Sequence, residues 1–270
     1  MAPRHAQSPA RKSLTRRGKA VSGLALTTLV GTALWAWPAS GDDHNSHPDA
    51  KHGTPTTTSR PDGAAEAADP EAAAAFRPIP GLSDAARKQI PAGTRQVLVV
   101  TGQGVNATSS AVILYTRAKG SQNWRPGPTW AAHNAAHGWT KDHRYGDLRS
   151  PEGVYALTDA GGRLAAPRGT RLPYDHNNSF VAHGTGVEGE PLAGAFDYVI
   201  AINYNRVAGS SPLDARRPLG ASKGGGVWLH VDHDGPTQGC VSLKPAVMKE
   251  LLRTLDPAQH PVIVMGPPGH

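Results

Sequence analysis

Short apolar runs, each ended by turn-forming residues, are the feature that most limits how this chain can fold. From about residue 77 onward, runs rich in Val, Ile, Leu and Tyr alternate with Gly, Pro, Asn and Asp. This alternation is typical of β-strands joined by turns. The sequence therefore predicts a mostly β domain over residues 77–270, with strands at 96–101, 111–116, 153–157, 197–203, 226–231 and 261–265.

One helix is predicted near the carboxyl end of the chain. Pro245 suits a first helical position because its φ is fixed near the helical value. Pro257 disfavours helical geometry at Asp256 and so ends the helix. Between them the apolar residues fall on one stripe that should pack on a sheet; they are Val247, Met248, Leu251, Leu252 and Leu255.

The first 39 residues differ in composition from the rest. Residues 1–19 contain six Lys or Arg and no acid, and residues 20–37 are uncharged and apolar. A basic stretch before an apolar one is typical of an export signal. Trp37 stands where a cleavage site requires a small residue, and the apolar run approaches the roughly 20 residues of a spanning helix. Residues 1–39 are therefore predicted to be a signal peptide or an uncleaved membrane anchor, and the folded domain to be exported, secreted or anchored.

Residues 40–76 contain no Leu, Ile or Val. A segment with so little to bury is predicted to be a disordered linker. Six of the formal net charges of +7 lie in residues 1–19, so the remainder of the chain is nearly neutral. A nucleic-acid reader would carry its Lys and Arg on a folded face. We therefore exclude nucleic acid as a partner.

Cys240 is the only cysteine in the sequence. Exported proteins that use cysteine structurally carry it in pairs, so a lone thiol indicates either a reactive group or a small buried apolar side chain. Cys240 follows a predicted strand that contains His230, and it precedes the predicted helix. We expect the helix N-terminus to lower the pKa of the thiol and His230 to serve as its base. Gly239 has no side chain and is expected to let backbone N–H groups approach an oxyanion.

The segment around Cys240 resembles the active-site motif of a known family. His230 on a strand, followed by Thr237-Gln238-Gly239-Cys240, is similar to the strand His and the Ser/Thr-x-Gly-Cys turn of the L,D-transpeptidase catalytic domain, also called the YkuD domain. Residues 145–153 (YGDLRSPEG) and 198–205 (YVIAINYN) resemble further segments of that family. The likeness therefore extends over about residues 96–265.

Two departures from the family pattern indicate a divergent branch with a Pro-Thr-x-Gly-Cys motif. Gln238 stands where the commoner pattern has His, and the spacing from His230 to Cys240 is shorter than usual. The resemblance implies a mixed β-sheet or sandwich with one main helix after the catalytic Cys. It also implies a site with no metal and no cofactor.

The activity implied by the resemblance is that of a peptidoglycan L,D-transpeptidase, a cysteine acyltransferase that acts on stem peptides. Cys240 would attack a donor tetrapeptide, release D-alanine and form a thioester, which an amine acceptor then resolves into a cross-link. His230 would move the proton, while Gly239, Thr237 and Gln238 would support the oxyanion. We expect the protein to act as a monomer.

Several interpretations stay open on the sequence. Candidates for substrate binding are His183, Tyr204, Asn205 and His233, although each also has a purely structural interpretation, and His233 is expected to be a solvated loop residue. If water replaced the amine, the same site would be an L,D-carboxypeptidase. His230, His233 and Cys240 could instead ligate zinc, or the domain could bind the wall without catalysis.

Overall fold

A computed structural model describes residues 77–270 of the chain. The predicted signal or anchor at 1–39 and the predicted linker at 40–76 lie outside the described residues, so both stay predictions. Within residues 77–270, no helix is both long enough and apolar enough to cross a membrane.

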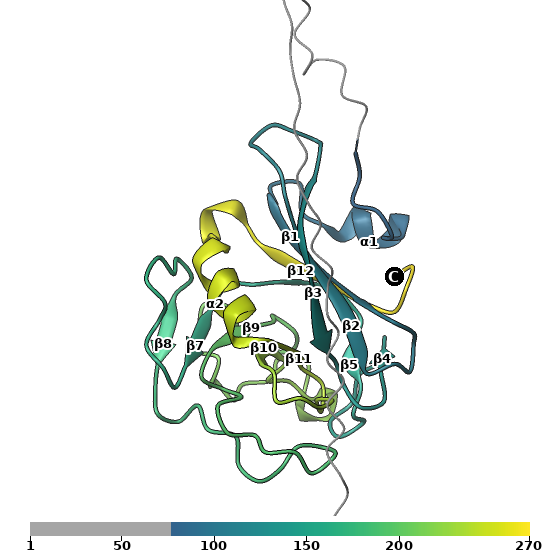
Figure 1. Ribbon diagram of the computed structural model, residues 1–270. Helices are drawn as coiled ribbons and strands as arrows, with labels where there is room; N and C mark the ends of the chain where they lie inside the picture. Colours follow the sequence, from purple (N-terminus) through teal and green to yellow (C-terminus); the bar gives the residue numbers. More distant parts are fainter. Residues whose placement is uncertain (1–76) are drawn as a thin grey trace, which may run out of the picture. The chain divides into compact units, whose positions relative to one another are not determined.

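One large mixed sheet dominates the domain (Figure 1). Its ten strands follow the order β6-β12-β1-β2-β3-β11-β10-β9-β7-β8, and β4 and β5 form a separate pair. Within the large sheet, β1 and β12, β10 and β11, and β7 and β8 run parallel, and the other neighbours are antiparallel. The mostly β class and the mixed sheet are confirmed.

The elements have the following bounds. The strands are β1 Gln96–Gly102, β2 Ser109–Thr116, β3 Arg125–His133, β4 Trp139–Thr140, β5 Ser150–Pro151, β6 Gly153–Ala156, β7 Ala160–Gly162, β8 Tyr174–His176, β9 Val199–Ala201, β10 Trp228–Val231, β11 Val241–Leu243 and β12 Val262–Gly266. The helices are α1 Asp84–Gln89 and α2 Pro245–Thr254, with 3-10 turns η1 Ala221–Lys223 and η2 Pro257–Gln259.

Strand β1 is buried on both of its faces. Leu98 and Val100 belong to one apolar core, whereas Val97 and Val99 belong to a second core that α1 helps to close. Because side chains alternate along a strand, the two cores lie on opposite faces of the sheet at β1. A strand covered on both faces reads as a continuous apolar run, which is why β1 was visible in the sequence.

Strand β3 was not predicted, because Pro126 and Pro128 interrupt it. Proline cannot donate a hydrogen bond to a neighbouring strand and is confined to edges or bulges. Among the described residues, β3 pairs with β2 along its length but with β11 only at Ala132 and His133. The two prolines therefore lie where β3 is an edge, and their missing N–H groups cost no hydrogen bond.

The predicted main helix is confirmed as α2, which lies beside β10 (Figure 1). Met248, Leu251 and Leu252 are buried, so the apolar stripe packs inward as expected. α1, which was not predicted, is a short helix whose first turn is capped by the Ser83 side chain. Its buried Ala86 belongs to the second core.

Replacing Leu251 by Ala should lower the free energy of unfolding by about 2–5 kcal/mol, because it removes a fully buried side chain from the larger core. Glu250 lies exposed on the same helix, so Glu250→Ala is a matched control that should change this energy by less than about 0.5 kcal/mol. Urea unfolding of both variants measures the difference. Equal effects would contradict the packing of α2.

Candidate active site

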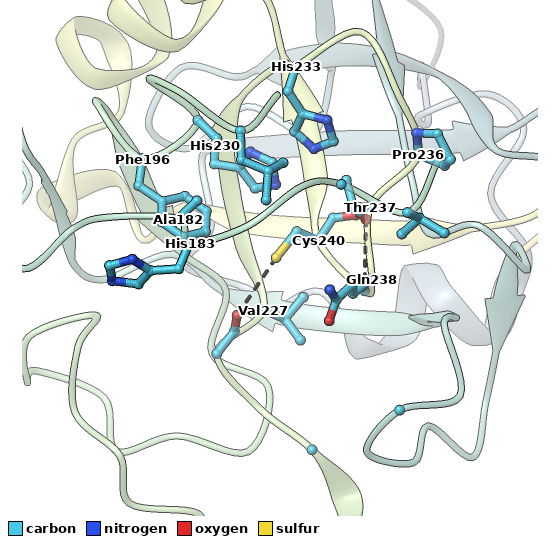
Figure 2. A pocket seen from close by; sticks show the side chains of 18 of the residues that line it. Ala182, His183, Phe196, Val227, His230, His233, Pro236, Thr237, Gln238 and Cys240 are labelled. Carbon is cyan, nitrogen blue, oxygen red and sulfur yellow. Dashed lines mark hydrogen bonds between the residues drawn. The ribbon is translucent and has the colours of Figure 1, made fainter. Parts of the chain in front are cut away.

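The parallel pair β10 and β11 positions the two predicted catalytic residues. His230 pairs with Ser242, so Cys240, which lies two residues before Ser242, is level with Trp228 on the neighbouring strand. Trp228 and His230 share one face of β10 because side chains alternate along a strand. His230 and Cys240 both line one cavity (Figure 2).

The cavity has a volume of about 430 Å³, within the range of roughly 300–1,000 Å³ that is usual for small-ligand sites. Its walls are the turn from His233 to Cys240, the glycine strip 224–226 and parts of the segment 181–196. Within the described part of the chain, no Lys, Arg, Asp or Glu lines it. Its ionisable lining is instead rich in imidazoles, those of His143, His183, His230 and His233.

The Cys240 thiol is held by backbone groups on both sides. Its sulfur accepts from the Trp228 N–H at 3.4 Å and donates to the carbonyl of Gly226 at 3.7 Å. Burial raises the pKa of the thiol to about 11, although the Trp228 N–H works in the opposite direction. The thiol is therefore protonated at neutral pH.

The predicted fall in the pKa of Cys240 is wrong. That prediction placed the thiol at the N-terminus of the helix, but β11 and Lys244 lie between Cys240 and the start of α2 at Pro245. Four extended residues span about 13 Å, and the effect of a helix dipole fades within its first turn. Burial is therefore the dominant influence on the pKa of the thiol.

His230 is buried, with its base nitrogen defined by a hydrogen bond. Nδ1 lies 2.9 Å from the carbonyl oxygen of Val231. Since a carbonyl only accepts, Nδ1 carries the proton and Nε2 keeps its lone pair. Burial lowers the pKa of His230 to about 4, so the imidazole is neutral at neutral pH. The resting pair is thus a neutral thiol and a neutral base, and not the thiolate that a lowered thiol pKa would favour.

Thr237 holds the turn that carries Cys240. Its Oγ1 donates to the carbonyl of Cys240 at 2.7 Å and accepts from the N–H of Gly239 at 3.2 Å. The Gly239 N–H is thus engaged, and a Cβ at this position would meet nothing closer than 3.5 Å. The geometry gives no support to the oxyanion role expected of Gly239. Gln238, by contrast, is exposed and lines the cavity.

The four candidates for substrate binding separate into two pairs. His183 and His233 line the cavity, and Tyr204 and Asn205 do not. The Tyr204 hydroxyl donates to the carbonyl of Lys223 at 2.8 Å, and the Asn205 amide donates to the carbonyl of Gly224 at 2.6 Å. Tyr204 and Asn205 therefore fix the strip that ends at Gly226, whose carbonyl accepts from Cys240.

His143 lines the cavity and was missed by the sequence analysis. Its Nδ1 lies 3.0 Å from Oδ1 of Asp147, and its ring stands edge-on to Tyr204 with centroids 5.3 Å apart. Burial lowers the pKa of His143, and Asp147 partly opposes this. One signal in the sequence could have identified His143. It is the four-residue spacing from His143 to Asp147, beside the segment 145–153 that resembles the family.

The zinc alternative required His230, His233 and Cys240 to act as ligands. All three line the cavity. Across residues 77–270, however, no group of three or more His, Cys, Asp or Glu side chains is arranged to hold a metal ion.

A thiol and a neutral imidazole with a free Nε2, facing one ligand-sized cavity, define the candidate site of a cysteine-dependent acyl transferase. The family model for the L,D-transpeptidase catalytic domain, YkuD, matches residues 84–264. This match covers more than half of the chain, and the chain belongs to that family. Its members are cysteine-dependent L,D-transpeptidases that act on the stem peptides of peptidoglycan. Searches of the curated proteins and of the solved structures found no match.

Alkylation of Cys240 by iodoacetamide should accelerate with pH from about 7 to about 10 without a plateau, because the thiolate is the nucleophile. A thiol whose pKa is about 11 gains about tenfold more thiolate per pH unit over this range. Mass spectrometry of the alkylated protein gives the rate. A rate that levels off above about pH 9, the ordinary pKa of a thiol, would show that the thiol pKa is not raised.

Thr237→Val keeps the shape of the side chain but removes both hydrogen bonds of its hydroxyl. It should slow acylation of Cys240 about 10–100-fold, because the turn that aims the thiol loses its clamp. Thr237→Ser keeps the hydroxyl and is the matched control, expected to stay within about threefold of the wild type. Rapid-quench measurement of acyl-enzyme formation compares them, and equal rates in Val and Ser variants would contradict the role of the clamp.

Proposed function

We propose that this protein is an exported peptidoglycan L,D-transpeptidase that forms cross-links between stem peptides through a thioester on Cys240. The observation that carries the proposal is that the neutral His230, whose Nδ1 is bonded to a carbonyl, lines the same cavity as the Cys240 thiol. Acyl transfer by a thiol needs a nucleophile, a base in reach and room for the acyl donor. The cavity of about 430 Å³ supplies the room.

In the first step, the sulfur of Cys240 attacks the carbonyl carbon of the third stem residue. Nε2 of His230 takes the thiol proton as the bond forms, so the thiolate never accumulates. The imidazolium then gives this proton to the nitrogen of the departing D-alanine, and the C–N bond breaks. The products are a thioester and free D-alanine.

In the second step, the side-chain amine of a neighbouring stem attacks the thioester. His230 accepts the proton of the amine and returns it to the sulfur of Cys240 as the C–S bond breaks. Every proton is exchanged between the substrates and these two side chains, so the proposed reaction requires neither a metal nor a cofactor.

The oxyanion of each tetrahedral intermediate needs donors close to Cys240. Gln238 is proposed for this role, because its exposed carboxamide lines the cavity and carries two N–H donors. This amide stands where the commoner family pattern has His. Thr237 and Gly239 contribute indirectly by fixing the turn.

Export is part of the proposal and is supported by the basic and apolar stretches of residues 1–39. Stem peptides lie outside the cytoplasmic membrane, so an enzyme that links them must reach that side. A retained apolar stretch would anchor the domain, and residues 40–76 would then act as a tether.

Incubating the purified full-length protein with a muropeptide tetrapeptide should produce a covalent adduct that has the mass of the donor without D-alanine. Cys240→Ala should abolish the adduct, and His230→Gln should slow its formation about 10²–10⁴-fold, the usual contribution of a general base. Intact-mass spectrometry follows the adduct, and analysis of the released peptides shows what resolves it.

The released products decide between the alternatives. Cross-linked dimers support the transpeptidase, whereas free tripeptide alone would make the protein an L,D-carboxypeptidase with the same residues. If no tetrapeptide gave an adduct or free D-alanine while the protein still sedimented with isolated cell walls, the domain would be a non-catalytic wall binder.

A further inference from the structure

His233 does not behave as the solvated loop residue that the sequence indicated. Its side chain is only 5% exposed. Its ring stacks on the ring of His230, with centroids 5.6 Å apart and planes within 9° of parallel. On its other side, Nδ1 of His233 lies 3.0 Å from Oε1 of Glu190. The base is thus backed by a second imidazole, which itself lies beside a carboxylate.

Glu190 is built into this arrangement by its own loop. The loop is closed by a bridge between Thr185 and Pro191, and the Gly186 N–H donates to the Glu190 carbonyl at 2.8 Å. Oε2 of Glu190 accepts from the N–H of Glu188 at 2.9 Å. Although burial opposes it, these backbone contacts and His233 hold the pKa of Glu190 below its usual value. The carboxylate is therefore ionised at neutral pH.

Two glycines leave the space that the carboxylate occupies. A Cβ at Gly186 would overlap Oε1 of Glu190, and a Cβ at Gly235 would lie 2.6 Å from the same atom. Gly235 belongs to the turn between β10 and Cys240, whereas Gly186 belongs to the loop. The Glu190 carboxylate therefore joins the loop to the turn that carries the nucleophile.

Three contacts restrain the His230 ring. Phe196 meets it edge-on, with centroids 5.5 Å apart and planes at 83°, and Nδ1 is bonded to the Val231 carbonyl. The third contact is the stacking of the His230 ring on the ring of His233. A ring that turned about its side-chain bonds would move Nε2 within the cavity that Cys240 also lines, and a displacement of about 1 Å can cost a factor of about 100 in rate.

We propose that Glu190 and His233 form a positioning pair, in which the carboxylate orients His233 and the His233 ring holds His230 in the orientation that aims Nε2 at Cys240. The pair makes the orientation of the base depend on the placement of Glu190 by the loop 185–191. This inference rests on the proposed acyl-transfer function and names two residues that serve it without touching the reacting atoms.

A double-mutant cycle tests whether Glu190 acts through His233. Glu190→Ala and His233→Ala should each lower kcat for D-alanine release from a muropeptide tetrapeptide by about 10–100-fold and leave KM within about twofold. Together they should cost no more than His233→Ala alone. Glu190→Gln, which keeps the shape of the side chain and an amide oxygen beside Nδ1 of His233, should recover most of kcat. Glu188→Ala on the same loop is the matched control and should match the wild type, because only the backbone of Glu188 contacts Glu190.

Acylation of Cys240 by p-nitrophenyl acetate separates this inference from the proposed function, since it needs thiol and base but no stem peptide. The burst of p-nitrophenolate should fall in the Glu190→Ala and His233→Ala variants as kcat does, even if no muropeptide is a substrate. Additive losses in the cycle, or a burst that depends on Cys240 and His230 but not on these two residues, would overturn the pair. If His233→Ala fails to fold, judged by circular dichroism, the comparison of Glu190→Gln with Glu190→Ala decides alone, and equal losses would reject the pair.

Discussion

The parallel pairing of β10 and β11 is the constraint on which the site depends. Adjacent parallel strands usually need a crossover of about a dozen residues or more, most often containing a helix, whereas here only Asp232 to Cys240 connects them. So short a connection must be fixed internally. Asp232 accepts from Ser242 at 2.7 Å and from His133 at 2.9 Å, and Thr237 binds the far end of the turn. With both ends fixed, the thiol and the imidazole face one cavity.

Burial then sets the chemistry of that pair. It moves the pKa of Cys240 up to about 11 and that of His230 down to about 4, so each group is neutral at rest. A neutral thiol is a poor nucleophile and a poor target for oxidants. The Cys240 thiol is therefore unreactive until an acyl donor binds and the base removes the thiol proton. This suits a lone cysteine that is proposed to work in an oxidising compartment.

The sequence predicted those parts of the fold that local pattern controls. Strands buried on both faces, such as β1, and the amphipathic helix α2 were predicted because their apolar residues are dense or periodic. β3 was hidden by Pro126 and Pro128, which only its partial edge position makes tolerable. β11 has only three residues and was not predicted. Without β11, the sequence places Cys240 directly before the helix, which is why it predicts a lowered thiol pKa that the structure contradicts.

Only part of the candidate site was predicted from the sequence. His230 and Cys240 were found because they form a motif close together in the sequence. Glu190 reaches the histidines of the cavity from a distant loop, and no local pattern reports that contact. His143 also comes from a distant loop, and its four-residue spacing to Asp147 was its only local signal. Tyr204 and Asn205 were noticed for their place in a family-like segment, but they support the glycine strip and do not line the cavity.

The pairing of β1 with β12 has a consequence for how the domain matures. Val97 to Thr101 lie beside Val262 to Gly266, so β1 acquires its parallel neighbour from a strand that is distant in the sequence. Contacts between such distant residues close late and slow folding. A chain emerging progressively from a ribosome holds no complete core until β12 is free to pair with β1. The core behind the nucleophile is therefore complete only when β12 has paired with β1.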